Sequence, residues 1–177
     1  MTATIPEVIT PRTLADYLEV MTRAVFQAGV SWKQIAESWE SYRAAFAKFD
    51  PALVATYGND DIERVLSTGG ILRSPRKARA TIENARTMLE LDRDYGGFAN
   101  YLRSFDSYAN VAKDLKKRFA FMGPMNVWYF LFRTGEAVPR FEQWVTTIPG
   151  DHPRMREMVE LARKQHKSPE QKGQPVF

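Results

Sequence analysis

The strongest constraint on the fold is a helical repeat of apolar residues along most of the chain. Between residues 32 and 49, apolar side chains recur at steps of three and four, at Ile35, Trp39, Tyr42, Phe46 and Phe49. This spacing places them on one face of a helix. No stretch sustains the two-residue alternation of a half-buried strand. We therefore expect an all-α fold that includes one helix over 32–49.

Proline and glycine divide the remaining sequence into further helices. Pro75 suits the first turn of a long helix, and Gly96 and Gly97 would end it. Shorter helices are expected over 98–105, 108–119, 125–134 and 153–164. We expect a single domain over 1–165, followed by a mobile tail over 166–177 that contains little to bury.

Composition restricts the classes of function. Hydrophobic residues make up 44% of the 177 residues, which suffices for a core. There is no apolar run of about 18 residues and no apolar segment typical of a secretory signal, so we expect a cytoplasmic protein without a membrane span. The sequence has no cysteine, which excludes disulfides, thiolate nucleophiles and cysteine-ligated metals. A net charge of +4 permits nucleic-acid binding.

The segment 108–135, YANVAKDLKKRFAFMGPMNVWYFLFRTG, has the outline of two helices joined by a tight hairpin at Gly123. Such a hairpin directs backbone N–H groups towards a phosphate, and Lys113, Lys116, Lys117 and Arg118 lie beside it in the sequence. The alternative is an ordinary helical turn with a solvated basic face, and the lack of an N–H on Pro124 favours that alternative.

Two other segments are candidates for binding. TGGILRSPRKAR, residues 68–79, clusters Arg73, Arg76, Lys77 and Arg79 at a helix start, where cations oppose the helix dipole. This placement suggests an anionic partner such as a DNA backbone, although a solvated surface explains it equally well. We expect this segment and the hairpin to share one surface.

FQAGVSW, residues 26–32, lies between two expected helices. Trp32 could stack on a flipped, positively charged base, or it could belong to the core.

Together these segments resemble the 3-methyladenine DNA glycosylase I family. FQAGVSW is similar to the family's QAGLSW motif, and YRAAFAKFDPALVA, DIERVLSTGGILRSPRKARATIENAR and DLKKRFAFMGPMNVWYFLFRTG resemble later family segments in the same order. The resemblance covers about residues 26–135.

The resemblance implies a helix-hairpin-helix glycosylase fold and base excision from duplex DNA containing alkylated bases. In that activity an alkylated base such as 3-methyladenine is flipped into a pocket and its N-glycosidic bond is hydrolysed. By position, Trp32 would be the pocket aromatic, Gly29 and Val30 would lie at the gap left by the flipped base, and Gly123 would be the hairpin glycine. Arg73, Arg76, Lys77, Lys116 and Lys117 would contact phosphates.

The sequence also departs from the family. Ala24 stands where the family has a Glu that contacts the alkylated adenine, and Pro139 and Arg140 stand about where it has Asp and a zinc-ligating His. The family's N-terminal segment, with a pocket Tyr and Trp, has no match here. His152 and His166 fit no zinc spacing, so we expect no metal and no other cofactor.

These features leave three hypotheses. The first is a divergent monomeric glycosylase with weak or altered activity and no assigned catalytic residue. The second is a protein that binds damaged DNA without cleaving it. The third is a helical scaffold that no longer binds DNA, in which four aromatic residues serve only packing or a protein partner: Trp128, Tyr129, Phe130 and Phe132.

Overall fold

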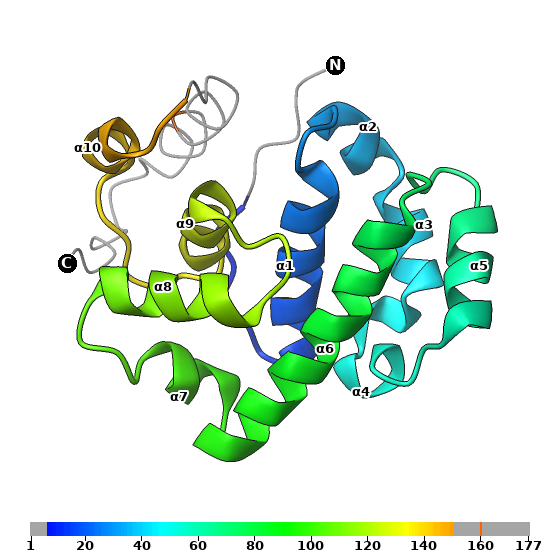
Figure 1. Ribbon diagram of the computed structural model, residues 1–177, viewed down its shortest axis with the longest axis horizontal. Helices are drawn as coiled ribbons and strands as arrows, with labels where there is room; N and C mark the ends of the chain where they lie inside the picture. Colours follow the sequence, from blue (N-terminus) through cyan, green and yellow to red (C-terminus); the bar gives the residue numbers. More distant parts are fainter. Residues whose placement is uncertain (1–6, 151–159, 161–177) are drawn as a thin grey trace.

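A computed structural model describes residues 7–150 and residue 160, and within these residues every regular element is a helix (Figure 1). The prediction of an all-α fold is confirmed. In chain order the elements are α1 (Leu14–Gln27), α2 (Trp32–Glu37), α3 (Trp39–Ala45), the 3₁₀ turn η1 (Ala47–Phe49), α4 (Pro51–Val54), α5 (Asn59–Ser67), α6 (Pro75–Tyr95), α7 (Phe98–Leu102), α8 (Tyr108–Arg118), α9 (Pro124–Arg133), α10 (Phe141–Trp144) and the 3₁₀ turn η2 (Val145–Thr147).

Two long helices, α1 and α6, cross in the middle of the molecule. Helices α2 to α5 lie on one side of this pair and α7 to α10 on the other (Figure 1). Helix α6 contacts α1, α4, α5 and α7, while α9 contacts α1 and α8. The core between them is rich in aromatic rings, and Tyr42, Tyr101 and Trp128 are fully buried. This core fixes the relative positions of the segments singled out above.

The prediction of one helix over 32–49 is wrong. The chain is interrupted at Ser38, where φ is −105° and ψ is 8°, and again after α3. Ala47, Lys48 and Phe49 then adopt positive φ angles of 51°, 53° and 60°. The breaks accompany ring stacking, because Trp39 lies parallel to Phe49 with centroids 5.3 Å apart. Apolar spacing predicted which residues are inside, but it did not show where the helix is interrupted.

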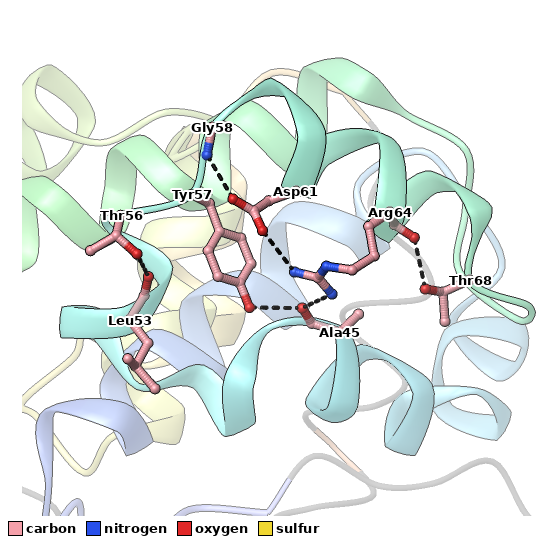
Figure 2. A network of polar contacts seen from close by, with 8 residues as sticks. All are labelled: Ala45, Leu53, Thr56, Tyr57, Gly58, Asp61, Arg64 and Thr68. Atoms are coloured by element: carbon pink, nitrogen blue, oxygen red, sulfur yellow. Dashed lines mark hydrogen bonds and ion pairs between the residues drawn. The ribbon is translucent and has the colours of Figure 1, made fainter.

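Polar contacts secure α5 against the end of α3 (Figure 2). The carbonyl oxygen of Ala45 accepts hydrogen bonds from the Tyr57 hydroxyl at 3.0 Å and from the Arg64 guanidinium at 3.2 Å. Arg64 also pairs with Asp61 at 3.4 Å. The last carbonyls of a helix lack partners within the helix, so these donors compensate for the end of α3.

Helix α6 begins at Pro75 and ends at Tyr95, with Gly96 as its C-cap, as predicted. The Ser74 hydroxyl oxygen caps it by accepting a hydrogen bond from the Lys77 amide at 3.2 Å. Gly96 has a φ of 67°, which a glycine adopts without strain. Halfway along, the Arg86 side chain donates to the carbonyls of Ala55 and Tyr57 at 2.9 and 3.3 Å. Helix α6 is therefore tied to the α4–α5 connection through main-chain atoms.

No helix in the described part of the chain is both long enough and apolar enough to cross a membrane. The predicted helix over 153–164, except for Glu160, and the predicted tail over 166–177 lie outside the described residues.

Candidate functional site

The predicted hairpin joins α8 to α9, and these two helices pack together. Asn84 of α6, which is 2% exposed, holds the hairpin at Ala120. Its Oδ1 accepts from the Ala120 amide at 2.8 Å and its Nδ2 donates to the Ala120 carbonyl at 3.2 Å. From the other side, Asn126 Nδ2 donates to the Phe121 carbonyl at 2.7 Å. Two side-chain amides therefore fix the backbone of the hairpin.

Gly123 is the N-cap of α9 and has a φ of −71°, an angle that any residue can adopt. A Cβ built there would meet no atom within 4 Å. The fold itself therefore does not require glycine at this position. The left-handed residue of the hairpin is instead Phe121, whose φ is 59°. Close approach of an external group to Gly123 stays a prediction.

Arg76 and Arg79, from the end of the 68–79 segment, share one surface with the hairpin, which agrees with part of the prediction, whereas Gly70 lies against Ser38 and Ser41. The Arg76 guanidinium lies 5.0 Å from the centroid of the Phe121 ring, within cation–π range. Around this contact lies a hollow of about 420 Å³, lined by Arg76, Arg79, Ala80, Glu83, Ala120 and Phe121. Arg73 and Arg79 are also exposed. Arg76 and Arg79 are thus available to an anion beside the hairpin.

Lys77 does not join this surface, and its predicted role in phosphate binding is contradicted by its burial. The residue is 8% exposed. Its ammonium donates to the carbonyls of Phe26 and Ala28 at 3.2 and 2.7 Å, and burial lowers its pKa. Lys77 lies on the inner face of α6 and reaches the end of α1. By contrast, Lys116 and Lys117 are exposed in the last turn of α8.

The predicted base-pocket residues, in and around the loop after α1, differ in solvent exposure. Gly29, with a φ of 75°, is exposed, and Val30 is half-buried. Trp32 is half-buried at the start of α2, and its ring packs edge-on against Tyr129 of α9, with centroids 5.6 Å apart. Ala24 is only 1% exposed, and its carbonyl lies 3.4 Å from Asn126 Nδ2. The Ala24 carbonyl therefore lies where α1 meets the start of α9.

Sequence reasoning missed two polar residues of α1 near Ala24. Gln27 follows Ala24 by one helical turn and is 4% exposed, and its Oε1 has no hydrogen-bond partner among the described residues. The Arg23 guanidinium lies 5.2 Å from the centroid of the Trp39 ring, and burial lowers its pKa. A helical projection of α1 would have placed Gln27 on the same face as Ala24.

The acidic residues of α1 do not replace a carboxylate at position 24. Asp16 accepts the amides of Arg12 and Thr13 at 2.8 and 3.1 Å and so caps its own helix. Glu19 accepts from Trp39 Nε1 at 2.9 Å and from Arg43 Nε at 2.7 Å. Each carboxylate is already committed to a structural partner.

Across residues 7–150 and 160, no three His, Cys, Asp or Glu side chains come together in a way that could hold a metal ion. Both histidines, His152 and His166, lie outside the described residues. The expectation that no metal binds stays a prediction.

Comparison with known proteins agrees with this geometry. A family described as methyladenine glycosylase matches residues 12–111. DNA-3-methyladenine glycosylase 1 of Escherichia coli (strain K12) is 39% identical over 79 residues, which cover 45% of this chain and 42% of that protein. The DNA-3-methyladenine glycosylase of Haemophilus influenzae (strain ATCC 51907 / DSM 11121 / KW20 / Rd) is 32% identical over 89 residues, which cover 50% of this chain and 48% of that protein. The matches thus span less than half the length of these two relatives.

Solved structures extend the similarity beyond the matched sequence. The structure of 3-methyladenine DNA glycosylase I from Staphylococcus aureus superposes with a TM-score of 0.66 at 25% identity, covering 75% of this chain and 81% of that one. Another 3-methyladenine DNA glycosylase I gives a TM-score of 0.63 at 29% identity, and the superposition covers 72% of this chain and 81% of that one. The family match covers more than half of the 177 residues and the helical architecture is shared. The chain therefore belongs to the methyladenine glycosylase family.

Proposed function

We propose that this protein binds duplex DNA containing alkylated bases, flips such a base out of the helix, and hydrolyses its N-glycosidic bond with weak or altered activity. The observation that carries the proposal is the convergence of three family segments. The hairpin, the start of α6 and the loop after α1 are joined by Asn84, by the Arg76–Phe121 contact and by Lys77. This arrangement supports a single DNA-binding surface beside a base pocket.

Hydrolysis of the N-glycosidic bond of a cationic base needs little catalytic assistance from the protein. A 3-methylated adenine is already cationic, so it leaves readily with the electron pair of the broken C1′–N bond. Water then forms the new bond to C1′ and releases a proton to solvent. Trp32, half-buried and braced by Tyr129, offers an aromatic face for a cationic base, worth about 0.5–2 kcal/mol. Stacking and flipping supply selectivity without a dedicated acid.

The direct test is release of free base from methylated duplex DNA by the purified protein. A known glycosylase serves as the positive control. We expect slow release of 3-methyladenine by the wild type and a further loss in Trp32→Ala. Robust release unaffected by Trp32→Ala would contradict the assignment of Trp32, and absence of both release and DNA binding would refute the proposal.

One observation favours a second candidate, binding of damaged DNA without cleavage. Ala24 offers no hydrogen bond to a base, and both nearby carboxylates of α1 have other partners. Loss of a charged hydrogen bond costs about 1.5–3 kcal/mol, roughly ten- to a hundredfold in recognition. Under the first proposal, Ala24→Glu raises base release. Thermal unfolding must be measured in parallel, because the Ala24 side chain is buried. Intact DNA binding without release by wild type or Ala24→Glu would establish the second candidate.

We further propose that the protein acts as a monomer in the cytoplasm. Arg76, Arg79 and the hairpin residues Ala120 and Phe121, which line one hollow, all belong to a single copy of the chain. Sedimentation of the protein with and without a short duplex tests the monomer, and a two-to-one stoichiometry would contradict it.

A further inference from the structure

The end of α1 is held by a side chain from another helix. The last four carbonyls of a helix have no partner within it, and a cation is favoured at that end. Helix α1 has no basic residue in its own last turn. Lys77, which is 51 residues from Phe26 and 49 from Ala28, supplies the cation and donates to both carbonyls.

These two hydrogen bonds flank the point where the loop leaves the helix. The hydrogen bonds within the loop itself are local. The Val30 amide donates to the Gln27 carbonyl at 3.3 Å, and Ser31 caps α2 through the Gln34 amide at 3.4 Å. Gly29, at a φ of 75°, is exposed and a Cβ there would meet no atom within 4 Å. The loop is thus anchored to α6 at its base and open at its tip.

Lys77 also lies next to the arginine that contacts the hairpin. Arg76 faces outward over Phe121, whereas Lys77 faces inward to the end of α1. The first turn of α6 therefore connects the proposed phosphate-binding surface with the loop that carries Gly29 and Val30. A shift of either segment against α6 would break these contacts.

We propose that Lys77 is a positioning residue. By fixing the end of α1 against α6, it holds the Gly29–Val30 loop where the loop can fill the gap left by a flipped nucleotide. The inference rests on the proposed function. It assigns Lys77 no contact with DNA. The contribution of Lys77 to affinity is limited to duplexes in which a base is missing from the stack, because the loop inserts only into such a gap. Phosphate contacts by Arg76 and Lys117, by contrast, contribute to binding of every duplex.

The test compares two duplexes of one sequence, one intact and one with a stable abasic-site analogue, by fluorescence anisotropy. We expect the wild type to prefer the abasic duplex. Lys77→Met should lose roughly tenfold in affinity for the abasic duplex, corresponding to about 1.4 kcal/mol, and leave intact-duplex affinity unchanged. Lys77→Arg, which keeps the charge, should restore part of the preference.

A destabilised control separates positioning from general loss of stability. Leu91→Ala removes a buried side chain at the other end of α6, where Leu91 is 4% exposed. This variant should unfold at lower temperature yet keep the preference for the abasic duplex. A Lys77→Met variant that keeps its preference, or that weakens on both duplexes equally, would overturn the inference.

Amide hydrogen exchange of residues 28–31 in the free protein distinguishes failure of the inference from failure of the proposed function. Lys77→Met should accelerate exchange there, because the loop has lost its anchor. Unchanged exchange would refute the anchoring itself. Accelerated exchange in a protein whose wild type binds no duplex would instead refute the proposed function, and with it any role of the anchor in DNA binding.

Discussion

Gly123 offers a substitution that separates folding from DNA binding. Its φ of −71° is open to alanine, and an added Cβ would meet no protein atom within 4 Å. Two opposing effects act on stability. Alanine restricts the unfolded chain, which stabilises by about 0.4–1 kcal/mol, but it is a poorer N-cap than glycine by a similar amount. We expect the free energy of unfolding of Gly123→Ala to stay within about 1 kcal/mol of wild type.

DNA binding should respond much more strongly. The open space at Gly123 is where a phosphate would approach the first turn of α9, in which the Met125 amide has no helical partner. A methyl group there would hold the phosphate away from that amide. Loss of one charged hydrogen bond costs about 1.5–3 kcal/mol, so affinity for an intact duplex should fall roughly ten- to a hundredfold.

A matched control exists within the chain. Gly58 is also an N-cap, of α5, with a φ of −115°, and a Cβ there would likewise meet nothing within 4 Å. Gly58→Ala should match Gly123→Ala in chemical denaturation but bind DNA like wild type. The reasoning fails if Gly123→Ala binds duplex DNA with wild-type affinity, or if both variants lose affinity equally.

Four other predictions follow from the contacts described above. Asn84→Ala should destabilise the fold and weaken DNA binding, because it leaves the amide and carbonyl of Ala120 without these partners and each buried unpaired polar group costs about 1–3 kcal/mol. Urea titration measures the loss of stability. Asn100→Ala, which removes two exposed hydrogen bonds to the carbonyls of Tyr95 and Gly96, is the control. Charge reversal at Arg76 or Lys117 should weaken binding to all duplex sequences and make it less salt-dependent, and wild-type affinity that is constant between about 50 and 200 mM salt would argue against phosphate contacts. Burial raises the pKa of Tyr108, so the folded state retains a proton that the unfolded state loses above about pH 10, and stability should fall as the pH rises past that point. Tyr108→Phe also removes a buried hydroxyl without a partner among the described residues, so it should raise stability at neutral pH and make the alkaline decline shallower; an unchanged alkaline profile would count against this account. Finally, protein purified without chelator should contain no stoichiometric zinc by elemental analysis.

The sequence predicted the helices better than the breaks between them. Pro75 and Gly96 bound α6 as predicted, because proline holds φ at a helical value and glycine adopts the left-handed φ of the C-cap without strain. The interruption at Ser38 has a weaker local signal, since serine is a common first residue of a helix and Ser38 is the N-cap of α3. Trp39, directly after it, stacks with Tyr42 and Phe49, a contact that spacing along the chain cannot reveal.

The same limit explains the error at Lys77. A run of basic residues at a helix start predicts a charged surface, but the partners of Lys77 lie about 50 residues away in the sequence. A signal was nevertheless present. Lys77 shares a three- and four-residue spacing with Thr81, Asn84 and Met88, all of which are buried. A helical projection of α6 would have placed both Lys77 and Asn84 on the inner face.

The side chains that radiate from α6 bind main-chain atoms of three separate segments. Lys77 reaches the end of α1, Asn84 the hairpin and Arg86 the α4–α5 connection. A backbone carbonyl is present at every residue, and a backbone N–H is present at every residue except proline. The residue that supplies the side chain should therefore tolerate fewer substitutions than the residue that supplies the backbone atom. In a saturation mutagenesis screen for folded protein, Lys77, Asn84 and Arg86 should accept few replacements, while the alanines whose backbones they bind, Ala28, Ala120 and Ala55, should change more freely.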